Sequence, residues 1–184
     1  FCKDEYYIEK KTDGDVDREI YRKNIAALKK YFDTCVESGI APEKLCFMPV
    51  PTASAVLREK LPKNAPYFDE FEVLSMVLQE LGNYTVINPT EVIGSLEYPY
   101  YKTDHHWTSL GAFYAFQEAA PSLGIEGDIS GKYVSYAVSN DFNGMLASKS
   151  GVYLSEKEQV DIYVPSDSDT AVSYTHLRAH ETDS

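Results

Sequence analysis

Apolar side chains recur at helical spacing in three stretches of the chain. The first runs from about Asp17 to Ser38 and stops at Gly39, a residue suited to a helix C-cap. The second runs from about Asp69 to Leu81, and the third from Thr108 to about Ala120, with Thr108 or the serine after it as N-cap. In the first two, the residues expected to face inward are Ile20, Ala27, Leu28, Tyr31, Phe32 and Cys35, and then Phe71, Leu74, Val77, Leu78 and Leu81. These patterns predict three amphipathic helices.

Short apolar runs between and after these helices predict strands. Two of them, Leu45 to Met48 and Tyr84 to Asn88, alternate with the first two helices, and two more, Tyr133 to Val138 and Val160 to Val164, follow the third. Strands that alternate with helices of this size favour an α/β fold with helices on both faces of a parallel sheet. Such sheets bind ligands at the carboxyl ends of their strands, where we expect the loop from Pro49 to Ser54.

Composition adds limits to this fold. The chain has 184 residues, 43% of them hydrophobic, which is enough for the core of one domain. Its formal net charge is -12, and it has no basic cluster with interleaved aromatic residues, so nucleic acid is excluded as a partner. The three cysteines, Cys2, Cys35 and Cys46, show no C-x-x-C spacing, and an odd number of cysteines cannot all pair within the chain. No apolar run reaches the ~20 residues that a membrane span needs.

Both ends of the chain carry signs of truncation. The last stretch, from Val172 to Ser184, resembles the translation of a sequencing adapter. We therefore expect a single domain over residues 1–170 and exclude residues 171–184, with His176 and His180, from the fold and the function. The chain also starts at Phe1 without an initiator methionine, so we expect a domain that is truncated at both ends.

The two remaining histidines and the only tryptophan form one run, Asp104-His105-His106-Trp107. In extended backbone, residues i and i+2 face the same side, so Asp104 and His106 should project together while His105 points away. A carboxylate on Nδ1 of an imidazole leaves Nε2 to take a proton from a hydroxyl nucleophile, and Trp107 would close one wall of the pocket. The run thus predicts a catalytic dyad. Two alternatives remain: an aspartate that caps a turn beside a backbone-bound histidine, and a metal site with one further ligand.

Three motifs in order carry a resemblance to a known family. They are residues 101–114 (YKTDHHWTSLGAFY), 48–53 (MPVPTA) and 141–150 (DFNGMLASKS). From about Lys3 to Val164 the chain resembles the DHHW family of Gram-positive bacteria, which is similar to the SGNH hydrolase-like domain of the alginate O-acetylation proteins. The resemblance implies an SGNH-hydrolase-like (flavodoxin-like) parallel sheet. It also implies that Asp104 and His106 are the orienting carboxylate and the general base of a Ser-His-Asp triad.

The serine of that triad has no match in this chain. In these families it lies in an Asp-Ser turn nearer the C-terminus, whereas Gly127-Asp128-Ile129-Ser130 has an extra residue and Ser166-Asp167-Ser168-Asp169 is not followed by a helical pattern. We therefore expect the nucleophile to lie beyond the truncated end. The residues expected to contact substrate are His105, Trp107, Thr52, Asn143, Gly144 and Ser148, although a plain turn explains Asn143-Gly144 equally well.

These features predict a fragment of a cell-surface O-acyltransferase or esterase that acts on an exopolysaccharide or cell-wall glycan by double displacement. No metal or organic cofactor is implied. The resemblance further implies an acyl donor delivered through a membrane-bound O-acyltransferase, and an extracytoplasmic location with anchoring through an N-terminal segment outside this chain. The alternative function is that of a non-catalytic glycan-binding or scaffold protein that retains the fold.

Overall fold

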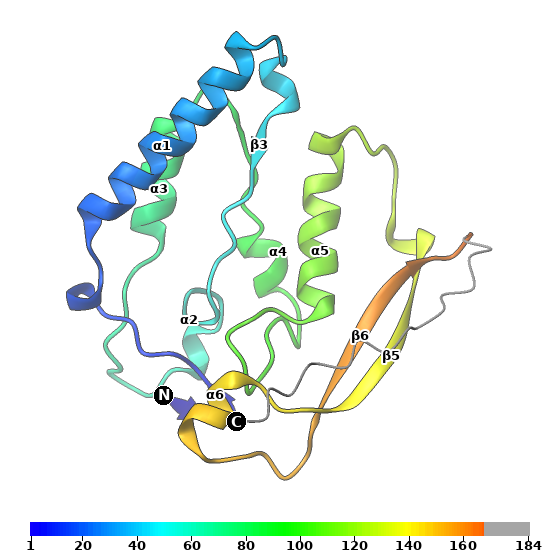
Figure 1. Cartoon of the computed structure of the whole chain (residues 1–184). Coiled ribbons are helices and arrows are strands. Elements are labelled where there is room, and N and C mark those ends of the chain that lie inside the picture. The colour runs from blue at the N-terminus through cyan, green and yellow to red at the C-terminus, as the bar shows by residue number, and fades with distance from the viewer. Residues whose placement is uncertain (168–184) are drawn as a thin grey trace, which may run out of the picture.

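Helices and short strands alternate through the first half of the chain, and a long hairpin follows them (Figure 1). The computed structural model describes residues 1–167. The adapter-like stretch, with His176 and His180, lies outside these residues. The helices are α1 (Arg18–Glu37), α2 (Ala53–Val56), α3 (Phe71–Glu80), α4 (Thr90–Gly94), α5 (Ser109–Ala119) and α6 (Met145–Ser150). The strands are β1 (Cys2–Lys3), β2 (Tyr6–Tyr7), β3 (Cys46–Phe47), β4 (Thr85–Val86), β5 (Tyr133–Phe142) and β6 (Glu158–Pro165).

Three two-stranded sheets form within residues 1–167. Strands β3 and β4 pair in parallel, as the alternation of helices and strands predicts, while β1 and β2 form a small antiparallel pair. The third sheet is the β5–β6 hairpin, whose antiparallel register shifts twice. The fold is therefore mixed α/β. The wider parallel sheet with helices on both faces remains a prediction, because only two strands are parallel in this part of the chain.

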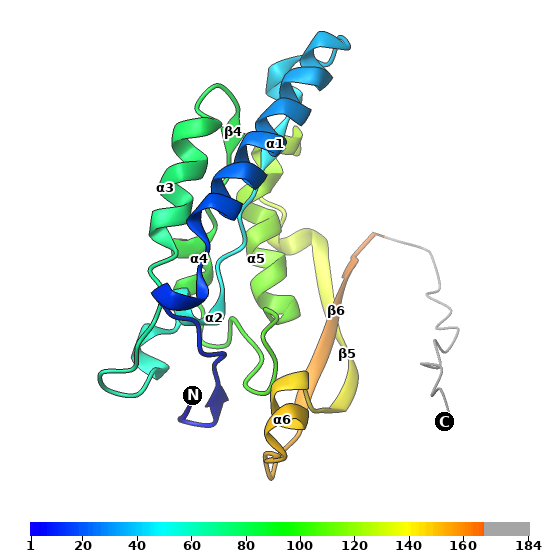
Figure 2. The ribbon, with the colours of Figure 1, turned by 60° about the vertical axis from the view of Figure 1, so that its left-hand side comes forward.

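Two apolar clusters lie on either side of β3. One joins α1 and α3 to the parallel pair and centres on Ile25, Val77 and Leu81. The other joins the N-terminal segment, α2, α4 and α5, and includes Ile93 and Tyr100. Figure 1 shows β3 passing between the pair α1 and α3 and the pair α4 and α5, and Figure 2 shows α3 beside α1. The second cluster carries the loop from α4 to α5, on which the candidate dyad lies.

The predicted helices form where the apolar spacing places them, and α1 and α5 each begin after a residue whose side chain caps the helix. Asp17 caps α1 by accepting hydrogen bonds from the N–H groups of Glu19 and Ile20, and Thr108 caps α5 by accepting one from Gly111. Gly39 follows α1 with a φ of +95°, a left-handed conformation that glycine adopts readily. The short helices α2, α4 and α6 were not predicted, because four to six residues carry little periodicity.

Of the inward residues predicted for the first two helices, five are in fact exposed: Ala27 and four larger side chains. In α1, Ile20 is 54% and Tyr31 63% exposed; in α3, Phe71 is 43% and Leu78 48% exposed. The buried stripe of each helix is narrower than its apolar stripe, since α1 and α3 bury mainly the side chains that meet each other and the β3–β4 pair. Strand β5 also runs on to Phe142, beyond its predicted end at Val138. No helix within residues 1–167 combines the length and the apolar character that crossing a bilayer requires.

Candidate active site

The loop between α4 and α5, residues 99–108, holds the Asp-His-His-Trp run and is called the site loop here. It folds back on itself: Tyr100 and Trp107 form an antiparallel bridge, and the Thr108 N–H donates to Pro99 O at 2.9 Å. Trp107 is half-buried against the second apolar cluster. Because α5 begins directly after this loop, the chain reverses within a few residues and presents residues 103–106 at its tip.

Asp104 and His106 meet at the tip of the site loop. Asp104 Oδ1 accepts a hydrogen bond from His106 Nδ1 at 2.6 Å and another from the His106 backbone N–H at 3.0 Å. Asp104 therefore caps its own turn and orients the imidazole at the same time, so the turn-capping part of the alternative interpretation also holds, while the His106 ring binds Asp104 and not the backbone. The predicted pairing is confirmed, but its cause is this turn and not the alternation of an extended strand.

The environment of the carboxylate keeps it ionised. Asp104 is 6% exposed, and its second oxygen, Oδ2, accepts from the Met145 N–H at 2.8 Å. Burial alone would raise the pKa of Asp104, but the hydrogen bonds from Met145 and His106 outweigh burial and lower the pKa below its ordinary value. The side chain of His106 is 68% exposed, so the imidazole offers its other face to solvent.

His105 does not point away, and that prediction is wrong. Its ring lies against that of His106, with centroids 3.9 Å apart, and its Nδ1 lies 3.5 Å from Asp104 Oδ1. The reason is that residues 103–106 form a bend, in which neighbouring side chains do not alternate as they do in a strand. Asp104, His105 and His106 each offer one ligand atom, all within 4.8 Å of one another. One carboxylate and two imidazoles are a donor set suited to a transition metal, although Asp104 Oδ1 and His106 Nδ1 are joined by the dyad hydrogen bond.

A buried carboxylate that the sequence analysis missed supports this turn from below. Glu158, at the start of β6, is 6% exposed and accepts four hydrogen bonds. Its Oε1 accepts from the Lys102 N–H at 2.5 Å and from the Tyr98 hydroxyl, and its Oε2 accepts from the Thr103 N–H at 3.0 Å and from the Thr103 hydroxyl. The sequence could have indicated this buried residue, because Glu158 lies on the same face of its strand as the apolar residues Val160, Ile162 and Val164.

Helix α6 closes the site from the other side. The Gly144 N–H donates to Thr103 Oγ1 at 2.8 Å, and the Leu146 N–H donates to Thr103 O at 3.0 Å. The backbone approaches so closely that a Cβ on Gly144 would lie 2.4 Å from Asp104 Cβ. Beside it, Asn143 Oδ1 is buried without a hydrogen-bond partner among residues 1–167, whereas Ser148 is exposed and donates to Gly144 O. Gly144 is thus a residue that lets α6 pack closely on the site loop. Its predicted contact with substrate stays a prediction.

The loop after β3 brings Thr52 to the site, as predicted. The Tyr100 hydroxyl donates to Pro51 O and ties this loop to the site loop. Thr52, Ser54 and His105 line a cavity of about 100 Å³, in which the Thr52 and Ser54 hydroxyls lie 2.8 Å apart. No serine hydroxyl within residues 1–167 is hydrogen-bonded to His106.

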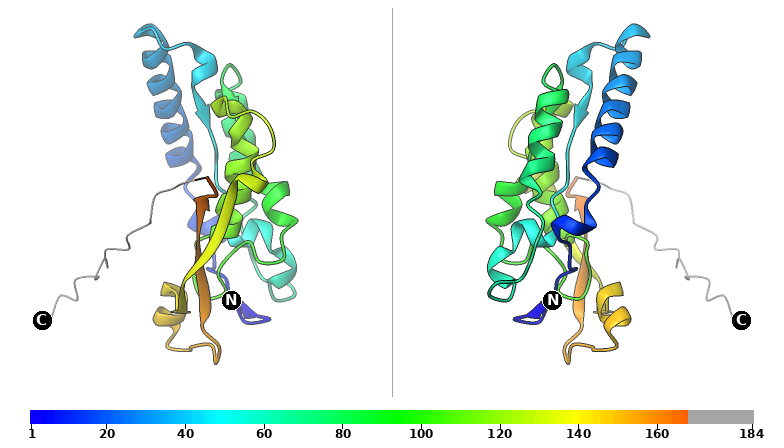
Figure 3. Two further views of the ribbon diagram at one scale, coloured as in Figure 1. Left: turned by 90° about the vertical axis from the view of Figure 1, so that its right-hand side faces the viewer. Right: turned by 90° about the vertical axis from the view of Figure 1, so that its left-hand side faces the viewer.

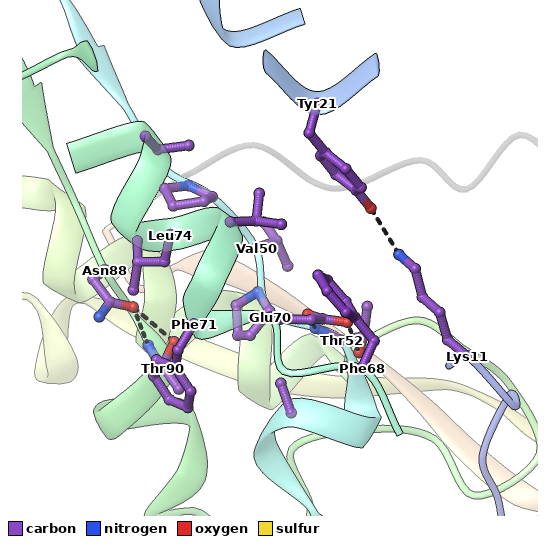
Figure 4. Close-up of a pocket in the computed structure, with 15 residues that line it drawn as sticks. Lys11, Tyr21, Val50, Thr52, Phe68, Glu70, Phe71, Leu74, Asn88 and Thr90 are labelled. Carbon is purple, nitrogen blue, oxygen red and sulfur yellow. Dashed lines mark hydrogen bonds between the residues drawn. The ribbon is translucent and has the colours of Figure 1, made fainter. Parts of the chain in front are cut away.

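A larger apolar groove of about 210 Å³ lies where the parallel strands end (Figure 4). It is lined by the segment after β3, including Val50 and Thr52, and by Asn88 and Thr90 after β4. The groove lies at the carboxyl ends of the strands, where a ligand site was expected; that this groove binds a ligand stays a prediction. The dyad does not line this groove. Thr52 is shared between the groove and the smaller cavity beside His105, which links the two.

Comparisons by sequence and by structure give different results. No protein-family model and no curated protein sequence matches the chain. Three solved structures share its fold: PatB1 of Bacillus cereus (20% identity, TM-score 0.68), the O-acetyltransferase domain of AlgJ from Pseudomonas putida (21%, 0.63) and a DHHW family protein of Eubacterium siraeum (22%, 0.63). PatB1 has also been solved with a sulfonyl adduct. The resemblance to the DHHW family and to the alginate O-acetylation proteins is confirmed at the level of the fold.

Coverage in these comparisons is unequal. The matches cover 91%, 89% and 79% of this chain, in the same order, but only 58%, 61% and 48% of the matched chains. The chain therefore spans about three fifths of the length of PatB1 and AlgJ, and about half that of the DHHW family protein.

Proposed function

We propose that this chain supplies the aspartate and the histidine of a Ser-His-Asp triad in an SGNH-like O-acyltransferase or esterase. The observation that carries the proposal is the 2.6 Å hydrogen bond between Asp104 Oδ1 and His106 Nδ1 on a buried, ionised carboxylate. With Nδ1 held by Asp104, Nε2 is the nitrogen that takes a proton from a hydroxyl group. Asp104 then stabilises the imidazolium that forms.

The serine of the triad is proposed to lie in a part of the protein outside residues 1–167. Two observations support this: no serine among these residues is hydrogen-bonded to His106, and the solved structures that share the fold extend well beyond the matched region. We propose that residues 1–170 belong to one SGNH-like domain. In this domain, the β3–β4 pair is part of a larger parallel sheet whose other strands lie outside the described residues.

The reaction is proposed to be double displacement. The serine attacks an acyl donor with His106 as base, the acyl-enzyme forms and the leaving group takes the proton from His106. A sugar hydroxyl or water, deprotonated by the same histidine, then attacks the acyl-enzyme and releases the ester or the acid. The O-acetyltransferase domain of AlgJ, which shares the fold, supports an acetyl group. The glycan acceptor is what the resemblance to the alginate O-acetylation proteins implies. We place the protein outside the cytoplasm, anchored to the membrane, with a membrane-bound O-acyltransferase as its acyl donor.

The substrate is proposed to enter beside His105 and Thr52, where the cavity of about 100 Å³ adjoins the dyad. His105 forms one wall of that cavity and stacks on His106, so it contacts the acyl group or the sugar and supports the base. Trp107, Asn143 and Ser148 are more distant supports, since Trp107 packs into the core and Ser148 lies on the exposed side of α6.

Labelling with a sulfonyl fluoride tests the triad. Sulfonyl reagents form stable adducts with activated hydroxyl nucleophiles, and PatB1 has been solved with a sulfonyl adduct. We expect the full-length protein to gain one sulfonyl group by intact-mass analysis, on a serine outside residues 1–167, and the present chain to gain none. A His106→Ala variant of the full-length protein should lose the labelling. Labelling of Ser54 in the present chain would refute the proposed location of the nucleophile.

A non-catalytic glycan-binding protein remains the second candidate. The exposed Tyr136 and Tyr153, which are 53% and 56% exposed, are the aromatic surfaces that favour it. Acetate release from a small activated ester separates the two. Hydrolysis by the full-length protein that disappears with His106→Ala supports the enzyme, and its complete absence together with glycan binding supports the second candidate.

A further inference from the structure

The least expected group near the dyad is a carboxylate with no part in the proposed proton transfer. Glu158 lies on β6, more than fifty residues after the site loop in the sequence, yet it contacts three residues of the segment 98–103. Figure 3 shows the β5–β6 hairpin running down one side of the molecule, with α6 at its lower end. The hairpin thus brings both Glu158 and α6 to the site loop.

The hydrogen bonds at Glu158 require a carboxylate and not an amide. An ionised carboxylate has two acceptor oxygens and no donor, and Glu158 faces four donors. One backbone N–H, which can only donate, points at each oxygen: that of Lys102 at Oε1 and that of Thr103 at Oε2. A glutamine in either orientation would therefore direct its NH₂ group at a backbone N–H. Burial, together with the hydrogen bond to Glu158, raises the pKa of Tyr98, so this phenol stays a donor.

The contacts continue from Glu158 to the reacting groups. The Thr103 hydroxyl donates to Glu158 and accepts from the Gly144 N–H at 2.8 Å. Asp104 follows Thr103 in the sequence, and Met145 follows Gly144. The Met145 N–H donates to Asp104 Oδ2. Thr103 is fully buried, so the link is shielded from water. Glu158 therefore fixes both segments that hold the Asp104 carboxylate.

We infer that Glu158 is a positioning residue for the Asp104–His106 dyad. This inference rests on the proposed function for its meaning in catalysis, but its structural part concerns the present chain alone. Glu158 holds the backbone of Lys102 and Thr103 so that Asp104 meets His106 Nδ1 and keeps the imidazole in the Nδ1–H tautomer, the form in which Nε2 is free to accept a proton.

Long-range ¹H–¹⁵N correlation spectra of the 184-residue chain test the structural part, because they report the tautomer of a histidine ring. His106 is assigned with His106→Ala. We expect the wild-type chain and Glu156→Gln to show the Nδ1–H tautomer, and Glu158→Gln to shift toward Nε2–H, the ordinary preference of a free imidazole. Glu156 is exposed and two residues away, so its variant matches the change in charge without the change in hydrogen bonding.

A second pair of variants keeps the test decisive if Glu158→Gln does not fold. Thr103→Val removes the hydroxyl that links Glu158 to Gly144 at nearly constant volume, and Thr103→Ser restores it. We expect the valine variant to shift the tautomer and the serine variant to keep it. An unchanged His106 tautomer in a folded Glu158→Gln chain, or in Thr103→Val, would overturn the inference.

In the full-length protein, Glu158→Gln should lower kcat for ester hydrolysis by roughly 10- to 100-fold, the effect of a misplaced catalytic group, with KM little changed. Glu156→Gln should retain both constants. If the tautomer shifts in the chain but the full-length protein hydrolyses no ester, the proposed function fails and the positioning role stands. If hydrolysis is robust and insensitive to Glu158→Gln, the positioning role fails and the proposed function stands.

Discussion

Replacing Gly144 with alanine tests whether the start of α6 packs directly on the dyad carboxylate. An alanine Cβ at this position would lie 2.4 Å from Asp104 Cβ and 2.4 Å from the carbonyl oxygen of Thr103. The backbone of Gly144, with φ -76° and ψ 174°, is open to alanine, so the expected damage comes from these contacts and not from backbone strain. Both opposing groups belong to the site loop, which the core and Glu158 hold in place.

The size of the effect follows from what must move. Ordinary contact distances begin at 3.4 Å, so the start of α6 has to retreat by about 1 Å from the site loop. Overpacking of this kind costs about 1–3 kcal/mol. The retreat also stretches the Met145 N–H bond to Asp104 Oδ2, and a hydrogen bond to a charged group contributes about 1.5–3 kcal/mol. Since the two losses share one movement, we expect Gly144→Ala to lower the free energy of unfolding by about 3 kcal/mol in total.

Urea denaturation followed by the fluorescence of Trp107, the only tryptophan, measures this change close to the site. Gly131→Ala is the matched control, because a Cβ there meets nothing within 4 Å and the residue lies outside the left-handed region. The control should unfold within about 0.5 kcal/mol of wild type, as exposed substitutions do. If Gly144→Ala were as mild as the control, α6 would not pack against Asp104 as described.

Three further predictions concern the dyad itself. In the full-length protein, His106→Ala should reduce kcat for ester hydrolysis by roughly 10³- to 10⁴-fold, whereas His105→Ala should cost about tenfold through lost stacking on His106; equal losses would contradict the assigned roles. Because hydrogen bonds lower the pKa of Asp104 on folding, its stabilising contribution is complete above the unfolded value of about 4 and is lost as the pH falls below it. The difference between the urea midpoints of wild type and Asp104→Asn should therefore be smaller at pH 3 than at pH 7. An equal difference at both pH values would refute the lowered pKa of Asp104. Chelators should leave esterase activity unchanged, whereas excess Zn²⁺ should inhibit it by binding to Asp104, His105 and His106. His105→Ala should raise the Zn²⁺ concentration needed for inhibition, and an unchanged concentration would exclude His105 as a ligand.

The sequence predicted the helices and the pairing of the dyad for different reasons. Long apolar periodicity located α1, α3 and α5, because burial of a stripe dominates the choice of structure over ten or more residues. The same reasoning overestimated the buried width of α1 and α3, since periodicity shows which side chains are apolar but not what covers them. Ile20 and Leu78 are apolar and exposed for that reason.

At the site, the spacing of residues correctly predicted that Asp104 and His106 meet, but the argument for it was incomplete. Side chains two residues apart lie together on one face of a strand, and they also meet where an aspartate caps its own turn. Asp104 and His106 therefore meet in either case. Only His105 distinguishes the two, because a strand turns it away and a turn brings it beside His106. A prediction built on spacing alone could not separate them.

The supporting residues were harder to predict, because each depends on contacts between distant segments. Glu158 reaches the site loop across 55 residues to Thr103, and Gly144 reaches it across 41. Locally, Glu158 is only a glutamate on the apolar face of a strand, and Gly144 is only a glycine at the start of a short helix. Their roles depend on contacts with the site loop that form once the hairpin packs against it. Together they explain how a buried aspartate is held in place here: its own loop and α6 provide the donors that offset burial, and Glu158 on β6 holds that loop by accepting hydrogen bonds from Lys102 and Thr103. The exposed ring of His106 can then exchange protons with substrate while its partner stays in place.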